Sequence, residues 1–291
     1  MRYKTVGLSF ILLFCVGCGW HALSPAYKQQ YAYLKESLPL SDHFPKTDRF
    51  LVILVAARHL DYRDFNHLLY TIAKHPSDGS KNGDVGHAWI YLQGEIEGSF
   101  ICIEGGHSGE LGIIQPKYLD GIMNYVEFGS VVYQPGGRLT YEPNPIRYLW
   151  EPQRDGFFQV GSGGHIPTCA AKIPITQQQL EQIVQFISTY PYHEYRLLDQ
   201  QCAGYVARIA AIAELSLAHT VVLEIPSVVY FKGEAIRLWE DEKYRSLMLS
   251  TPDCLERSLW NAIKEGKASH AMGWYKHQIR DGRRKHPTTH H

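Results

Sequence analysis

Residues 50–57 form a run of eight consecutive apolar residues, Phe-Leu-Val-Ile-Leu-Val-Ala-Ala, and no other feature limits the possible folds of this chain as strongly. An unbroken apolar run of this length, bounded by polar residues and rich in branched side chains, is typical of a strand buried inside a domain. We therefore predict a buried strand at 50–57.

A hairpin is predicted after this strand. Segments 85–93 and 99–104 have strand character and flank the Gly-rich loop 94–98, a pattern typical of two antiparallel strands. A hairpin centred on that loop places His87 opposite Glu104. Further strands are expected at 123–128, 130–133 and 168–173.

Helices are predicted from their start signals and apolar spacing. Thr176-x-x-Gln179 is a capping box, and Thr251-Pro252-Asp253 is a second helix start with Pro at its first position. The expected helices cover 26–38, 62–73, 177–187, 202–217 and 252–264.

The charge balance excludes one class of function. Lys and Arg number 29, Asp and Glu also number 29, and the formal net charge is zero. A broadly basic nucleic-acid binder is therefore not expected. Apolar residues make up 45% and charged residues 20% of the chain, which is close to the average for a folded domain.

The N-terminus has the pattern of an export signal. A short basic start, Met1-Arg2-Tyr3-Lys4, precedes an apolar run that is too short to span a membrane. The run ends in Cys15-Val16-Gly17-Cys18, which resembles a bacterial lipobox with Cys18 as the lipidated residue. An ordinary secretory signal and an uncleaved anchor are the alternatives. We predict a lipoprotein signal peptide at 1–18, a spacer at 19–48, a catalytic domain at 49–268 and a flexible basic tail at 269–291.

His87 is the first candidate site residue. It shares one face of its predicted strand with Trp89 and Tyr91, because side chains alternate along a strand. Glu104 on the opposite strand has the chemistry to orient an imidazole, and His107 is the competing orienter. A metal site formed by these three residues and Cys202 is an alternative interpretation. Against it, Glu104 and His107 are separated by a Gly-Gly turn, so they lack the helical spacing of zinc-binding motifs.

Cys202 is the candidate nucleophile. It opens a predicted helix, where free N–H groups and the helix dipole favour a thiolate and stabilise an oxyanion. Ala203 and Gly204 follow it and allow the helix start to approach a sheet closely. Cys102, Cys169 and Cys254 complete the cysteines of the expected catalytic domain, and the sequence leaves their disulfide state open.

These motifs, taken in chain order, resemble a family. Gly86-His87-Ala88-Trp89-Ile90-Tyr91, then Ile103-Glu104-Gly105, then Gln201-Cys202-Ala203-Gly204-Tyr205-Val206 are similar to the circularly permuted papain-like cysteine hydrolases. That group includes permuted NlpC-type peptidases, YiiX- and YaeF-type lipoproteins and relatives of lecithin:retinol acyltransferase. The match covers roughly 85–210. Gln201 stands where many permuted members have Asn, and the insert before Cys202 is long.

The resemblance implies an α+β fold in which an antiparallel sheet packs against helices and the nucleophile opens a helix. It also implies Cys202 as nucleophile, His87 as general base and then acid, and Glu104 as orienter. The amide of Cys202 is the implied oxyanion donor, and Tyr195, Gln200 and Gln201 are candidates for a second donor.

The function predicted from the sequence is a thiol hydrolase or acyltransferase in the bacterial cell envelope. Its substrate is an amide or ester, in a peptidoglycan peptide or a lipid, and no cofactor is expected. The partners expected are the membrane, reached through the lipid anchor, and the peptide or lipid substrate, with no nucleic acid. The alternative is a non-catalytic binding lipoprotein on the same fold.

Overall fold

The protein is described by a computed structural model that covers residues 48–72, 85–109, 131–134, 138–141, 150, 156–196, 198–231 and 234–285. The predicted signal peptide with Cys18, nearly all of the spacer with its 26–38 helix, and the 123–128 strand lie outside these residues.

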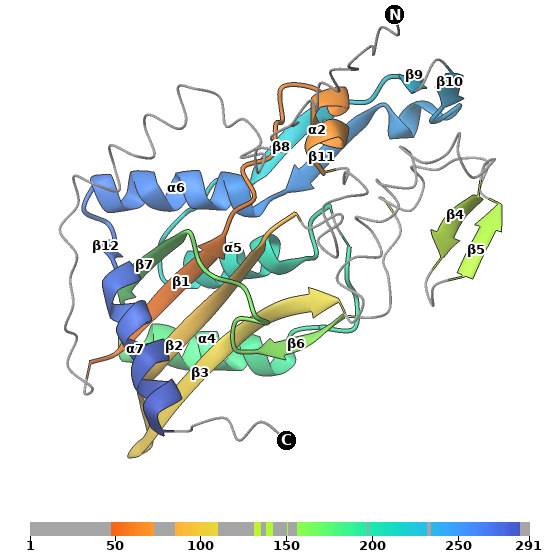
Figure 1. Cartoon of the computed structure of the whole chain (residues 1–291). Coiled ribbons are helices and arrows are strands. Elements are labelled where there is room, and N and C mark those ends of the chain that lie inside the picture. The colour runs from red at the N-terminus through yellow and green to blue at the C-terminus, as the bar shows by residue number, and fades with distance from the viewer. Residues whose placement is uncertain are drawn as a thin grey trace, which may run out of the picture.

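The described chain is a mixed α+β structure built on a six-stranded antiparallel sheet with the order β12-β7-β1-β2-β3-β6 (Figure 1). Its strands are β1 (Phe50–Ala56), β2 (His87–Ile96), β3 (Ser99–Gly109), β6 (Gly156–Val160), β7 (Cys169–Pro174) and β12 (Ser269–His270). Two-stranded sheets pair β4 (Val131–Gln134) with β5 (Arg138–Tyr141), β8 (Thr220–Glu224) with β11 (Ser246–Ser250), and β9 (Val228–Phe231) with β10 (Glu234–Arg237).

The helices of the described chain are α2 (Phe65–Ile72), α4 (Gln177–Thr189), α5 (Cys202–Ile212), α6 (Pro252–Lys264) and α7 (Met272–Lys285), with a short 3₁₀ turn η3 (Glu242–Tyr244). The predicted starts of α4 and α6 are confirmed. Thr176 forms the capping box, and Thr251 caps α6 with Pro252 in the first turn. Helix α5 ends at Ile212, earlier than the expected 217.

The predicted buried strand is confirmed as β1. All seven of its residues are buried, and it pairs with β2 on one side and β7 on the other. Leu51, Ile53 and Val55 pack with α4, α5 and α6, whereas the alternate side chains face α7. Burying each such aliphatic side chain stabilises the fold by about 1.5–3 kcal/mol. The apolar run therefore forms the centre of two cores, one on each face of the sheet.

The predicted flexible tail is wrong over 269–285. Strand β12 extends the sheet beside β7, and α7 covers one face of it through Met272, Trp274 and Tyr275. Most residues of this segment are polar, but its apolar side chains face the sheet, and Trp274 among them contacts Phe50 and Tyr91. Residues 286–291 lie outside the described chain.

The predicted β2–β3 hairpin is confirmed, but its register is wrong. Strand β2 continues to Ile96, so a two-residue turn at Glu97 and Gly98 replaces the expected five-residue loop. Both turn residues have positive φ, 51° and 76°, which is the backbone geometry of a type I′ hairpin. Glu104 consequently pairs with Tyr91 and not with His87.

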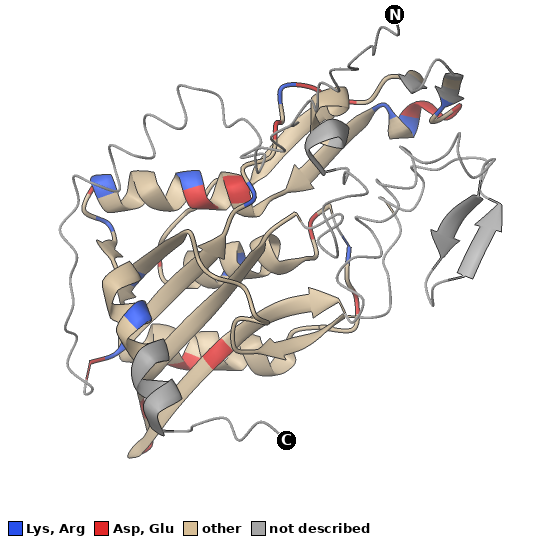
Figure 2. Cartoon of the chain, in the orientation of Figure 1, with Lys and Arg blue, Asp and Glu red and all other residues tan. Residues whose placement is uncertain are grey.

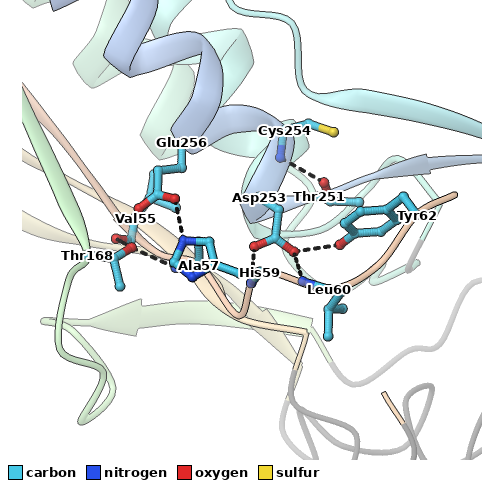
Figure 3. Close-up of polar contacts among 10 residues, drawn as sticks. All are labelled: Val55, Ala57, His59, Leu60, Tyr62, Thr168, Thr251, Asp253, Cys254 and Glu256. Atoms are coloured by element: carbon cyan, nitrogen blue, oxygen red, sulfur yellow. Dashed lines mark hydrogen bonds and ion pairs between the residues drawn. The ribbon is translucent and has the colours of Figure 1, made fainter. Parts of the chain in front are cut away.

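A buried polar cluster ties the end of β1 to the start of α6 (Figure 3). The buried carboxylate of Asp253 accepts hydrogen bonds from the amides of His59 and Leu60 and from the Tyr62 hydroxyl. These contacts hold His59 at a φ of 58°, a conformation uncommon for a residue other than glycine. Burial raises the pKa of Asp253, and the three donors oppose that rise.

His59 also pairs with a second buried carboxylate. Its Nε2 lies 2.7 Å from Oε2 of Glu256, whose side chain is fully buried. Burial of the imidazole disfavours its charge, yet the hydrogen bond and charge of Glu256 outweigh this and raise the pKa of His59 above 6.5. The cluster therefore stabilises the join between β1 and α6 most strongly when His59 is protonated.

Replacing Asp253 with Ala should destabilise the protein strongly, because two partly buried amides and a hydroxyl would lose their acceptor. Each unsatisfied group costs about 1–3 kcal/mol, so we expect a loss of several kcal/mol in urea unfolding. Asp241→Ala is the matched control, since Asp241 caps the exposed turn η3. Equal effects of the two substitutions would contradict the assigned role of Asp253.

The His59–Glu256 pair should make stability depend on pH. A His whose pKa is raised on folding contributes stability that is complete below its unfolded value of 6.5 and lost as pH rises through the folded value. The difference in unfolding free energy between wild type and Glu256→Gln should therefore shrink as pH rises above 6.5. A difference that stays constant or grows would show that His59 is not protonated in the pair.

Candidate active site

Helix α5 presents Cys202 at its first residue. Gln201 is the N-cap in extended conformation, and its side-chain oxygen accepts the amide of Ala203 at 2.6 Å. Its side-chain nitrogen donates to the carbonyl of Ser250, at the junction of β11 and α6. Gln201 therefore fixes the helix start, and its amide is committed to that task and not to an oxyanion.

Cys202 is buried, with 2% of its surface exposed, in the core between α5 and the sheet. The segment before α5 can pass close to the start of the helix because Gly204 has no side chain. A Cβ there would meet the carbonyl oxygen of Asp199. The predicted arrangement of a cysteine at a helix N-terminus packed on a sheet is thus present.

His107, named from the sequence as a competing orienter, lies on the side of the sheet where α5 packs. It is fully buried near the end of β3 and is enclosed by the rings of Tyr190, Tyr192, Tyr195 and Tyr205. Tyr205 belongs to α5, one helical turn after Cys202. The structure therefore brings His107 and Tyr195 into one cluster with the helix that carries the cysteine.

The hydrogen bonds of His107 define its tautomer. Nε2 donates to the carbonyl of Tyr192 at 2.9 Å, which leaves Nδ1 as the acceptor, and the Tyr190 hydroxyl lies 3.4 Å from it. Burial, with a smaller contribution from the positive charge of Arg208, lowers the pKa of His107 to about 4. His107 is consequently a neutral imidazole near pH 7 with its basic nitrogen directed at Tyr190.

Tyr190 places its hydroxyl 3.4 Å from Nδ1 of His107. Burial raises the pKa of Tyr190 to about 12. The hydroxyl is therefore protonated near pH 7 and can donate to that nitrogen. Tyr190 was not a candidate from the sequence, and a Tyr beside a Pro carries no pattern that separates a site residue from a core residue.

His87 occupies a different environment from the one predicted. Its ring stacks on Trp89 at 5.6 Å and on His165 at 4.9 Å, and Trp89 belongs to the core that α7 covers. Cys202 belongs to the core on the other face. His87 is therefore stacked within the α7 side of the sheet, away from the face that holds the cysteine.

The imidazole of His87 is nearly inaccessible and neutral. Burial, followed by the charges of His165 and His107, lowers its pKa to about 3. Within the described chain, its Nε2 is buried and has no hydrogen-bond partner. His165 was missed at the sequence level because the Gly-rich segment around it reads as a simple turn.

Glu104 does not orient His87. Its Oε1 accepts hydrogen bonds from the Trp89 indole at 3.2 Å and from the Tyr275 hydroxyl at 2.7 Å. The carboxylate thus joins β3 and β2 to α7. The predicted orienter is wrong because the shorter hairpin turn moved its position along β2.

The metal reading gains no support from these contacts. No group of three or more His, Cys, Asp or Glu side chains that could hold a metal occurs among the residues that the structure describes. Within the described part of the chain, no disulfide joins the cysteines at 102, 169, 202 and 254. In Figure 3 the thiol of Cys254 points away from His59, so those two residues form no catalytic pair.

We compared the chain with models of known protein families, with curated proteins and with solved structures, and found no significant match in any of the three comparisons. Within the described residues, no helix is long and apolar enough to span a membrane.

Acid should destabilise the protein through His87. The unfolded imidazole protonates near pH 6.5 while the folded one stays neutral to about pH 3, so stability falls as pH drops below 6.5. Between pH 7 and pH 5 this single group should cost about 2 kcal/mol.

Urea unfolding of His87→Gln, compared with wild type at both pH values, measures this effect. The variant should lose less stability on acidification. Histidine resonances give a second check, because His87 should not titrate between pH 5 and 7. An ordinary titration midpoint near 6.5 would contradict the buried neutral state.

Proposed function

We propose that the protein is a thiol hydrolase or acyltransferase in which Cys202 is the nucleophile and His107 is the general base and acid. The observation that carries the proposal is the position of Cys202 at the first residue of α5, with His107 against the same helix and its tautomer set by Tyr192. This keeps the predicted nucleophile and replaces the predicted base.

The N-terminus of α5 favours the chemistry of a nucleophilic thiol. Free N–H groups and the positive end of the helix dipole stabilise a thiolate and the oxyanion formed after its attack. The amide of Ala203 already binds Gln201. The backbone amide of Cys202 itself is therefore the donor we assign to the oxyanion.

The imidazole of His107 has the protonation state that a general base requires. It is neutral, and its Nδ1 accepts from Tyr190. In the proposed reaction His107 takes up the thiol proton as sulfur attacks an amide or ester carbonyl. The same proton then leaves with the amine or alcohol. Water, or a second acceptor, then attacks the resulting thioester and gives a proton to His107. The carbon–sulfur bond breaks, the acid or the acylated acceptor leaves, and His107 returns the proton to the Cys202 thiolate.

The remaining parts of the proposal rest on the resemblance stated from the sequence. A strand hairpin followed by a cysteine-bearing helix against an antiparallel sheet is consistent with a permuted papain-like fold. The lipobox at Cys18 supports a lipid-anchored protein of the bacterial envelope. Peptidoglycan peptides and lipid amides or esters are the substrate classes to compare.

A non-catalytic binding protein is the second candidate, and burial favours it. Cys202 is 2% exposed and His107 fully buried, so a substrate reaches them only after neighbouring side chains move. Reactivity of the thiol separates the two candidates, because a buried structural cysteine is inert.

Alkylation provides the first test of the proposed function. Iodoacetamide near neutral pH should modify Cys202 at least about ten times faster than Cys169, an equally buried thiol whose pKa is raised by burial. Mass spectrometry of the two peptides gives both rates in one sample. Equal rates would exclude an activated thiol at position 202.

Hydrolysis of muropeptides, lipid amides and thioesters is the second part of the test. Cys202→Ala should abolish turnover, and His107→Ala should lower kcat about 10²–10⁴-fold, as expected for loss of a general base. His87→Ala is the comparison, since the proposal gives it no proton-transfer role. If His87→Ala lowers kcat and His107→Ala does not, the general base is His87 and not His107. Turnover by Cys202→Ala would refute the mechanism.

A further inference from the structure

The turn that joins β6 to β7 carries an exposed apolar surface. Val160 and Ile166 are 81% and 82% exposed, the highest values among the large apolar side chains that the structure describes as exposed. Phe157, on β6, is also partly exposed at 40%. Three apolar side chains therefore face solvent on the edge strand β6 and on the connection that leads from it to β7.

The segment is also without charge. Residues 156–170 contain no Lys, Arg, Asp or Glu, and β6 and the following turn carry neither charge colour in Figure 2. The other exposed apolar pair, Val222 and Met248, is different. These two residues face each other across β8 and β11, and the ion pair of Glu224 and Arg245 lies on the same hairpin. Of these two surfaces, the β6–β7 turn is the one that combines apolar exposure with a continuous uncharged stretch.

The glycines of this turn leave part of it open to solvent. Gly161, Gly163 and Gly164 all have positive φ, between 60° and 82°. A Cβ added at Gly161 or Gly164 would meet no atom within 4 Å. The connection is anchored at both ends: the amide of Gly161 donates to the carbonyl of Glu104, and the amide of Thr168 donates to the carbonyl of Val55. Between these anchors the amide of His165 donates to the carbonyl of Ser162, and the His165 ring stacks on His87.

A buried polar atom lies directly beneath this turn. His165 stacks on His87, whose Nε2 is buried without a partner in the described chain. Leaving a buried polar atom unsatisfied costs about 1–3 kcal/mol. A ligand that displaces His165 and supplies a hydrogen bond to this nitrogen would recover that free energy. The unsatisfied nitrogen is an observation independent of the exposed apolar residues, and it indicates a ligand with a polar group.

We propose that the β6–β7 turn is a lipid-binding element: Val160 and Ile166 insert among acyl chains at a bilayer surface, His165 moves, and His87 Nε2 hydrogen-bonds a lipid head group. The inference goes beyond the proposed function and does not depend on Cys202 being catalytic. It gives His87 a binding role on the face of the sheet that α7 covers.

The size of the surface favours a bilayer over a second copy of the chain. A stable protein interface buries about 800 Å² per partner, far more than two aliphatic side chains and a partly exposed ring provide. Insertion at a membrane surface needs only a few apolar side chains. The spacer of roughly 30 residues after Cys18 is long enough, at about 3.5 Å per extended residue, for a lipid-anchored domain to reach the bilayer in many orientations.

Photolabelling tests the contact. The full-length protein is bound to vesicles of phosphatidylethanolamine and phosphatidylglycerol that contain a phospholipid with a diazirine in its acyl chain. Mass spectrometry should find adducts on the peptide with Val160 and Ile166 at least about five times more often than on peptides with Val222 and Met248. V160S/I166S should lose this labelling, while the matched control V222S/M248S should keep it. Equal labelling of the two patches, or none, would refute the contact.

Diethylpyrocarbonate modification tests the displacement of His165. His165 should be modified several-fold faster on vesicles than in detergent micelles, because it leaves the ring of His87, and V160S/I166S should abolish the difference. His87, whose Nε2 binds the head group, should stay protected on vesicles, whereas His165→Ala should expose it without vesicles. Unchanged reactivity of His165 on vesicles would overturn the displacement, and rapid modification of His87 there would overturn the head-group contact. Cross-links between two copies of the protein through the 156–170 peptide would show that this surface binds a second copy and not a bilayer, and would refute the proposal. None of these readouts requires activity, so they fail or succeed separately from the proposed function.

Discussion

Burial of β1 on both faces is the constraint on which the rest of the structure depends. The strand pairs with β2 and β7, and its alternate side chains face α7 on one side and α4, α5 and α6 on the other. Because both faces must be covered, helices that are far apart in the chain have to meet at this sheet. That requirement holds the N-terminus of α5 against β2 and β3 and so positions Cys202.

Buried histidines lie on the two opposite faces of this sheet, in different surroundings. His107 lies among tyrosines beside α5, while His87 stacks between Trp89 and His165 on the other side. Burial keeps both imidazoles neutral, with pKa values of about 4 and about 3. The protein therefore holds two buried bases at one sheet, and we assign proton transfer to one and ligand binding to the other.

The hairpin turn shows how a small backbone feature redirects a site. Glu97 and Gly98 close the β2–β3 hairpin in two residues where the composition indicated five. The partner of Glu104 on β2 is therefore Tyr91, four residues after the predicted partner His87. Because four is an even number, the two possible partners lie on the same face of the sheet. Glu104 binds Trp89 and Tyr275 and secures α7. The polar-looking C-terminal segment was mispredicted because its apolar stripe becomes evident only against its partner, the face of the sheet.

The sequence by itself determined the local elements: the buried strand at β1, the hairpin, the caps of α4 and α6, and the start of α5 at Cys202. These follow from periodicity and capping chemistry, which act over a few neighbouring residues. Only the tertiary structure decided the register of β2 and β3, the docking of α7, and that His107, not His87, lies beside the helix of Cys202. The register depends on which two residues of 94–98 close the turn, which their composition leaves open. The other two depend on the packing of surfaces that are far apart in the chain.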